Sequence, residues 1–174
     1  CSPETCNNRL ASLRSFLRYL GSRDISFLFL TLNANTIPFQ KTLRKKVKGM
    51  SRKAVKTLLS IPDLQTKIGR RDITIITFIY GTAARISEVL SIKVNHLYLN
   101  ADKPYVTVIG KGNKIRTLYL LPKVVTYLKK YLKEFHANKP NPNAYLFYSR
   151  HVGIMGKMTP EAVNKRLKKY AAIA

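Results

Sequence analysis

The sequence is poor in acidic residues. Only 8 of its 174 residues are Asp or Glu, against 32 that are Lys or Arg, and the formal net charge is +24. Eight scattered acids provide no carboxylate cluster of the kind that a metal-dependent nuclease uses, so that class of enzyme is disfavoured. The excess of positive charge predicts a polyanionic partner. Nucleic acid is the leading candidate, because basic side chains that neutralise phosphates release condensed counterions.

Cysteines and long apolar runs are also scarce. The two cysteines, Cys1 and Cys6, form no CxxC motif and no Cys/His cluster, so we expect no zinc site and no other cofactor. The chain has no signal peptide and no apolar run of membrane-spanning length, which predicts a cytoplasmic protein that does not bind membranes. It begins with Cys rather than Met, and we expect it to be a piece of a longer protein.

The length of the chain fits one domain, or one domain plus a fragment, and 45% hydrophobic residues are enough for a real core. A first helix is predicted over residues 1–22, because Ser2-Pro3-Glu4 is a good helix start and Gly21 a good stop. Its apolar residues recur at helical spacing and need partners to cover them. They are Leu10, Leu13, Phe16, Leu17 and Leu20.

Residues 23–50 are predicted to be a basic linker, because Asn33, Asn35, Pro38 and Gly49 interrupt any periodicity. From residue 41 to residue 56 the chain carries eight cations and no acid. A solvated linker is one interpretation, and a strap along a DNA backbone is the other. We favour the strap, because like charges repel one another unless an anion is near. The eight cations are Lys41, Arg44, Lys45, Lys46, Lys48, Arg52, Lys53 and Lys56.

An α+β fold is predicted for residues 51–174. Helical patterns cover about 51–59, 70–80, 87–92, 122–135 and 160–170, and the second of these is apolar enough to be buried. Between them the period changes to two, which predicts strands at 105–109 and 115–120 joined by a tight turn, with a third short strand near 97–99. The result is a mostly helical domain with a small three-stranded antiparallel sheet.

Two cations stand where a phosphate site would need them. Arg85 follows the buried helix and precedes a helix start, where a guanidinium can present its planar fork to a phosphate; the alternative is a structural ion pair with Glu88. Lys111 lies between Gly110 and Gly112 on the tight turn. Its ammonium group can protonate a leaving oxygen or hold a phosphate, and the alternative is a solvated turn.

The segment Gly81-Thr82-Ala83-Ala84-Arg85-Ile86-Ser87-Glu88-Val89-Leu90-Ser91-Ile92 resembles the first arginine box of the tyrosine recombinases, the phage integrase family. Residues 108–114 resemble the turn between the second and third strands that follows this box in the family. Residues 12–20 resemble the last helix of the family's core-binding domain, and residues 37–39 resemble the connector to its catalytic domain. The resemblance covers nearly the whole chain.

The resemblance implies a role for each matching residue. Arg85 would be the first catalytic arginine, which contacts the scissile phosphate, and Glu88 would orient it. Lys111 would be the general acid toward the leaving 5′ oxygen, and the chemistry needs no metal. The implied partner is double-stranded DNA, on which the parent family assembles as a tetramer at paired sites. The cations expected to contact DNA are Lys41, Arg44, Lys45, Lys46, Lys48, Arg52, Lys53 and Lys114.

The chain also departs from the family pattern. The family continues with a His-x-x-Arg box, a His or Trp, and the tyrosine nucleophile, whereas the run from His151 to Ile154 has no arginine at its fourth place. Tyr170 lies on a helix that resembles the one preceding that box, so we do not expect it to be the nucleophile. Ile115 stands where a charged residue is common. We therefore expect a fragment truncated at both ends: residues 1–22 from a core-binding domain, a linker, and the first part of a catalytic domain over 51–174.

This fragment is expected to bind DNA without recombining it, since a reaction through a phosphotyrosine needs the tyrosine. One alternative is a stand-alone DNA-binding or regulatory remnant; the nucleotide sequence beyond both ends would distinguish the two. Another is an RNA-binding, ribosomal-type protein using Tyr105 and Tyr119 on an open sheet face, which leaves the arginine box unexplained. Competition between duplex DNA and single-stranded RNA would test it.

Overall fold

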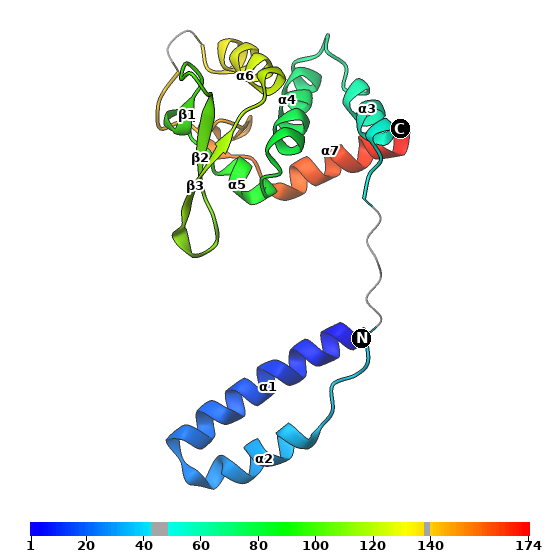
Figure 1. Cartoon of the computed structure of the whole chain (residues 1–174), viewed down its shortest axis with the longest axis vertical. Coiled ribbons are helices and arrows are strands. Elements are labelled where there is room, and N and C mark those ends of the chain that lie inside the picture. The colour runs from blue at the N-terminus through cyan, green and yellow to red at the C-terminus, as the bar shows by residue number, and fades with distance from the viewer. Residues whose placement is uncertain (43–48, 138–139) are drawn as a thin grey trace. The chain divides into compact units, whose positions relative to one another are not determined.

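A computed structural model of the chain describes residues 1–42, 49–137 and 140–174, and for Lys111 the backbone alone. The chain divides into two compact units, Cys1–Gly49 and Met50–Ala174 (Figure 1). Four of the cations expected to contact DNA, Arg44, Lys45, Lys46 and Lys48, lie outside the described residues.

The first unit is a pair of helices, α1 over Pro3–Arg23 and α2 over Leu28–Thr36, joined by the short 3-10 turn η1 over Ile25–Phe27 (Figure 1). As predicted, Ser2 caps α1, and its hydroxyl accepts a hydrogen bond from the Thr5 amide at 3.2 Å. The Thr31 hydroxyl of α2 donates to the Leu17 carbonyl of α1 at 2.9 Å. Arg14 of α1 donates to the Ala34 carbonyl, also at 2.9 Å.

The linker expected over residues 23–50 is therefore wrong for its first part, because residues 28–36 form α2. The prediction gave weight to Asn33 and Asn35 as breaks. In the structure these residues lie inside the helix, since contacts with α1 outweigh their weak local preference for turns. The two helices still leave much apolar surface open. Phe16, Phe29 and Leu32 are each more than half exposed.

The second unit has the predicted α+β architecture. Its helices are α3 over Arg52–Ser60, α4 over Lys67–Thr82, α5 over Ile86–Leu90, α6 over Pro122–Phe135 and α7 over Pro160–Ile173. The strands are β1 over Leu97–Tyr98, β2 over Tyr105–Ile109 and β3 over Ile115–Tyr119, which form an antiparallel sheet in the order β1-β2-β3. Two 3-10 turns, η2 over Val94–His96 and η3 over Lys111–Asn113, precede β1 and β3.

One element of this unit was not predicted. A small antiparallel hairpin, β4 over Tyr148–Ser149 and β5 over Gly153–Lys157, lies between α6 and α7. β5 contains two glycines, which weaken the strand signal of the hairpin. Gly153 has a φ of 82°, a conformation that favours glycine and lets the chain turn back.

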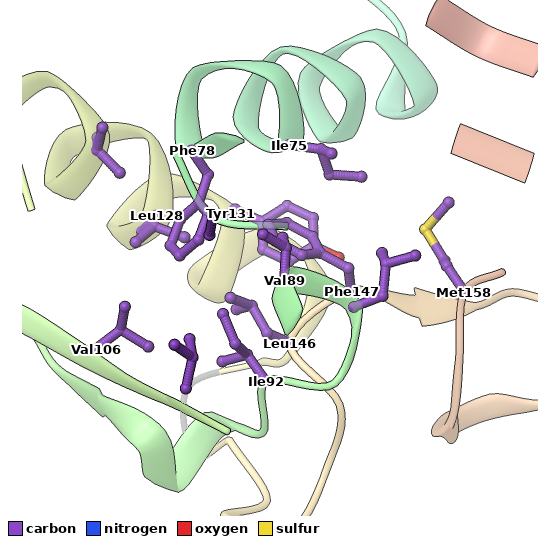
Figure 2. Packing of buried hydrophobic residues seen from close by; sticks show 14 of the residues in the cluster. Ile75, Phe78, Val89, Ile92, Val106, Leu128, Tyr131, Leu146, Phe147 and Met158 are labelled. Carbon is purple, nitrogen blue, oxygen red and sulfur yellow. The ribbon is translucent and has the colours of Figure 1, made fainter. Parts of the chain in front are cut away.

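The core of the second unit holds the site in place. Ile75 and Phe78 of α4 pack with Leu128 of α6, Val106 of β2 and Phe147 (Figure 2). The rings of Phe78 and Phe147 meet edge to face with centroids 6.2 Å apart. Each such side chain contributes roughly 1.5–3 kcal/mol when fully buried. This packing fixes the end of α4, from which the chain turns toward the arginine box.

Candidate functional site

Arg85 and Glu88 form the start of α5. The turn into them uses Ala83, whose left-handed φ of 51° ends α4. The Arg85 backbone N–H donates to Glu88 Oε2 at 2.9 Å, and the Arg85 guanidinium Nη1 donates to Glu88 Oε1 at 3.0 Å. The Glu88 side chain is 4% exposed and that of Arg85 is 68% exposed. Glu88 thus holds one edge of the guanidinium, while the Arg85 side chain stays largely exposed.

A second arginine, which the sequence analysis missed, shares the same carboxylate. Arg116 Nη2 of β3 donates to Glu88 Oε2 at 2.6 Å. In the sheet register Arg116 lies opposite the buried Val108, and antiparallel partners share one face of a sheet. The side chain of Arg116 is 45% exposed, so burial does not force this pairing. The available signal was the predicted strand pairing, which places Arg116 opposite Val108.

The carboxylate of Glu88 stays ionised in this setting. Burial alone would raise its pKa. Hydrogen bonds from the Arg85 backbone N–H, the Arg85 guanidinium and the Arg116 guanidinium outweigh burial and hold the pKa of Glu88 below its usual range. One negative charge therefore faces two guanidinium groups, and the cluster carries a net positive charge.

The β2–β3 hairpin begins beside this cluster. The Gly110 N–H donates to the Lys114 carbonyl at 2.8 Å, which closes the turn. A Cβ atom at Gly110 would lie 3.4 Å from Glu88 Oε1, so the backbone just before Lys111 approaches the carboxylate that holds Arg85. Within the turn, Gly112 has a φ of 73°. The structure thus places the arginine box beside the start of the hairpin.

The other predicted DNA contacts are dispersed. Lys114 is exposed at the end of the hairpin, and Arg52 and Lys53 are exposed in the first turn of α3. Lys41 is exposed in the first unit. Each places a positive charge on the surface of its own unit. Their contribution to DNA binding remains a prediction.

A second polar cluster surrounds Asp72 of α4. Arg71 donates to Asp72 Oδ1 through Nε at 3.0 Å and Nη2 at 2.7 Å. Arg166 Nε and the Tyr170 hydroxyl of α7 each donate to Asp72 Oδ2 at 2.7 Å. Burial raises the pKa of the Tyr170 hydroxyl, and its hydrogen bond to Asp72 raises it further. Tyr170 is buried and serves as a donor within the fold.

In the described ranges, no three or more His, Cys, Asp or Glu side chains come together in a way that could hold a metal ion. None of the helices in the described part of the chain combines the length and apolar character needed to cross a membrane.

Curated proteins similar to this chain are recombinases. Tyrosine recombinase XerD of Listeria monocytogenes is 32% identical over 153 residues, which cover 86% of this chain and 50% of that protein. Tyrosine recombinase XerD of Pseudomonas putida is 29% identical over 174 residues, covering 99% of this chain and 56% of that protein. The chain spans about half the length of the curated relatives it matches.

The fold is also that of known recombinases. A structure of the Tn1549 transposon integrase in complex with a circular intermediate DNA aligns with a TM-score of 0.69 at 18% identity, covering 100% of this chain and 60% of that chain. XerA recombinase aligns with a TM-score of 0.59 at 18% identity, covering 94% and 61%.

A family model described as the phage integrase family matches residues 48–174. The resemblance to tyrosine recombinases that the arginine box suggested is therefore confirmed. Since the match covers well over half of the sequence, the chain belongs to the phage integrase family.

Proposed function

We propose that this chain binds duplex DNA and holds a scissile phosphate between Arg85 and Lys111, as part of a site-specific recombinase. The observation that supports this proposal most directly is the position of Glu88, which orients Arg85 and lies beside the start of the hairpin that bears Lys111. The XerD proteins of similar sequence are tyrosine recombinases, and the Tn1549 integrase of similar fold is in complex with DNA. The net charge of +24 suits such a partner.

In this proposal Arg85 donates to the non-bridging oxygens of the phosphate and stabilises the charge that develops on them. Glu88 keeps the guanidinium in one orientation, so less conformational freedom is lost when the phosphate binds. Lys111, on a turn that begins beside Glu88, protonates the leaving 5′ oxygen. Protein cations supply the electrostatic stabilisation, and the scheme needs no metal or cofactor.

We further propose that the chain by itself does not cleave DNA. Tyr170 lies late in the sequence, which makes it the tyrosine to consider as a nucleophile. Its hydroxyl is buried and donates a hydrogen bond to Asp72. A nucleophile must reach the phosphate, and a hydroxyl buried within the fold does not. Assembly of the complete enzyme as a tetramer on paired sites is part of the same proposal.

DNA binding tests the first claim. Arg85→Ala should weaken binding to a short duplex by about ten- to a hundredfold, since a charge-assisted hydrogen bond contributes about 1.5–3 kcal/mol. Lys123→Ala, which removes an exposed cation at the start of α6, is the matched control and should have a small effect. Fluorescence anisotropy at one fixed salt concentration measures both. Equal affinities for Arg85→Ala and the unmodified chain would contradict the proposed phosphate site.

A nicked suicide substrate tests the second claim. We expect no covalent protein–DNA adduct after denaturing electrophoresis. An adduct that forms with the unmodified chain and disappears in Tyr170→Phe would make Tyr170 the nucleophile and overturn the claim.

A further inference from the structure

Arg116 of β3 reaches the arginine box and pairs with the buried carboxylate of Glu88. Its Nη2 donates to Glu88 Oε2 at 2.6 Å, which makes it the shortest of the three hydrogen bonds that this carboxylate accepts. The two residues lie 28 positions apart, so the bond joins a strand to a helix start that the chain brings together only on folding.

The donors around Glu88 are divided between its two oxygens. Oε1 accepts from the Arg85 guanidinium at 3.0 Å. Oε2 accepts from the Arg85 backbone N–H at 2.9 Å and from Arg116. Rotation about the last side-chain bond of a glutamate is soft, so a carboxylate keeps one orientation only where donors hold its oxygens. Arg116 holds Oε2, and Oε1 is thereby kept in place for the guanidinium of Arg85.

The guanidinium of Arg85 has little else to hold it. Within the described residues its one hydrogen bond is to Glu88 Oε1, and the side chain is largely exposed. An exposed arginine without a fixed partner samples many rotamers, and that freedom is lost when it binds a ligand. Whatever holds Glu88 therefore also determines how well Arg85 is preorganised.

Arg116 acts from a rigid part of the fold. In the sheet it pairs with Val108 of β2, a residue that is 2% exposed. On its other side along β3, the Lys114 carbonyl accepts from the Gly110 N–H at 2.8 Å and closes the hairpin turn. Side chains that orient a site do so best from sheets and helices that are themselves packed. The backbone at Arg116 meets that condition.

We propose that Arg116 is a positioning residue, which fixes the guanidinium of Arg85 by holding the carboxylate of Glu88. The inference rests on the proposed function, because it concerns the phosphate site that contains Arg85. Arg116 acts on that site through Glu88 and does not itself contact the phosphate. Its loss should therefore change the behaviour of Arg85, and not only the stability of the fold.

A second ion pair between elements provides the matched control. Arg70 of α4 donates to both oxygens of Glu134 in α6, through Nε at 2.8 Å and Nη2 at 2.7 Å. The Arg70 side chain is 36% exposed, close to the value for Arg116. In the described part of the chain this pair has no bond to Arg85. Loss of the Arg70 pair should lower stability and leave Arg85 unchanged.

The mobility of the Arg85 side chain tests the inference. Arg116→Met keeps a long side chain and removes its donors, and Arg70→Met is the control. The heteronuclear NOE of the Arg85 Nε–H group, measured by NMR, should fall in Arg116→Met and stay unchanged in Arg70→Met. Arg116→Lys should restore it, because an ammonium group can make the single bond that Nη2 makes. An Arg85 Nε–H group that stays as rigid in Arg116→Met as in the unmodified chain would overturn the inference.

A double-mutant cycle separates positioning from direct contact. Arg116→Met should weaken binding to the short duplex about three- to tenfold, and Arg116→Lys should restore most of that loss. In a chain that already carries Arg85→Ala, Arg116→Met should weaken binding no more than Arg70→Met does, because no guanidinium is left to position. Equal fold-changes with and without Arg85 would mean that Arg116 contacts the phosphate itself, which contradicts the inference. Binding is measured below the melting temperature of every variant, and Arg116→Gln replaces Arg116→Met if the latter does not fold.

The inference and the proposed function fail in different ways. If Arg85→Ala weakens binding and Arg116→Met behaves like Arg70→Met in both measurements, the inference fails and the proposed function stands. If Arg85→Ala leaves binding unchanged and the NOE of Arg85 still falls in Arg116→Met, then Arg116 positions Arg85 and the proposed phosphate site is wrong.

Discussion

At the scale of single residues, Glu88 of the second unit is a buried carboxylate that pairs with two arginines. Its carboxylate accepts from Arg85, which caps the start of α5, and from Arg116 of β3. We predict that Glu88→Gln lowers the free energy of unfolding by about 1–2 kcal/mol. The value is below the 3–5 kcal/mol typical of a fully buried pair, because both arginines are partly solvated. Urea unfolding measures this loss of stability, and Asp102→Asn, in an exposed loop, is the control.

The effect of Glu88→Gln on the free energy of unfolding should depend on pH. The folded pKa of Glu88 lies below the ordinary value of 4.5, so its carboxylate favours folding above that pH. This contribution disappears as pH falls through the depressed folded pKa. The stability difference between the unmodified chain and Glu88→Gln should thus be full at pH 7 and shrink in strong acid. A difference that stays constant across this range would show that packing, and not charge, is what Glu88 contributes.

The pairings that the sequence predicted and those that it did not predict differ in the separation of the partners along the chain. Arg85 and Glu88 lie three positions apart, so a local helix-start pattern predicts their pairing. Arg116 lies 28 positions from Glu88, and Arg166 lies 94 positions from Asp72. These partners meet through the sheet and through the packing of α7 near α4. Such contacts depend on register and tertiary packing, which local patterns determine only in part.

At the scale of elements, the end of α4 determines where Arg85 lies. Two glycines of α4 show how tightly this helix is packed. A Cβ atom at Gly69 would lie 1.8 Å from the Asp63 carbonyl oxygen, whereas one at Gly81 would lie 2.7 Å from Val124 Cγ2. Backbone cannot move aside as a side chain can. We predict that Gly69→Ala costs about 2 kcal/mol, because the clash exceeds the gain in helix propensity. Gly81→Ala should be within about 1 kcal/mol of neutral. Thermal unfolding compares them, and equal losses would contradict this account.

Element prediction succeeded where a sequence pattern was regular and failed where it was interrupted. The start of α6 at Pro122 and the strand Tyr105–Ile109 agree with the sequence prediction, because each carries several periods of its pattern. The hairpin β4–β5 and helix α2 were missed. Their sequences are brief or interrupted by asparagine and glycine, and they are stabilised by neighbouring elements more than by local preference.

At the scale of the whole molecule, the two units differ greatly in burial. In the described part of the first unit, Thr31 and Ala34 are the buried residues, whereas α4 of the second unit has an unbroken buried run from Asp72 to Phe78. Local opening costs least where few apolar contacts must be broken. We predict that backbone amides of α1 and α2 exchange with solvent hydrogen far faster than those of α4. Hydrogen exchange followed by NMR measures this, and similar protection in both units would contradict it.

The charge of the whole chain leads to a last prediction. A formal net charge of +24, with cations such as Arg52, Lys53 and Lys114 exposed on the second unit, predicts binding that is dominated by the phosphate backbone. If at least six phosphates are contacted, affinity for a duplex should fall about a thousandfold between about 50 and about 200 mM salt. It should also vary little with the duplex sequence, because phosphate contacts carry no sequence information. Titrations of several unrelated duplexes across this range measure both properties. A flat salt dependence would exclude the basic strap and leave base-edge contacts as the source of affinity, since counterion release accompanies every phosphate that a cation neutralises.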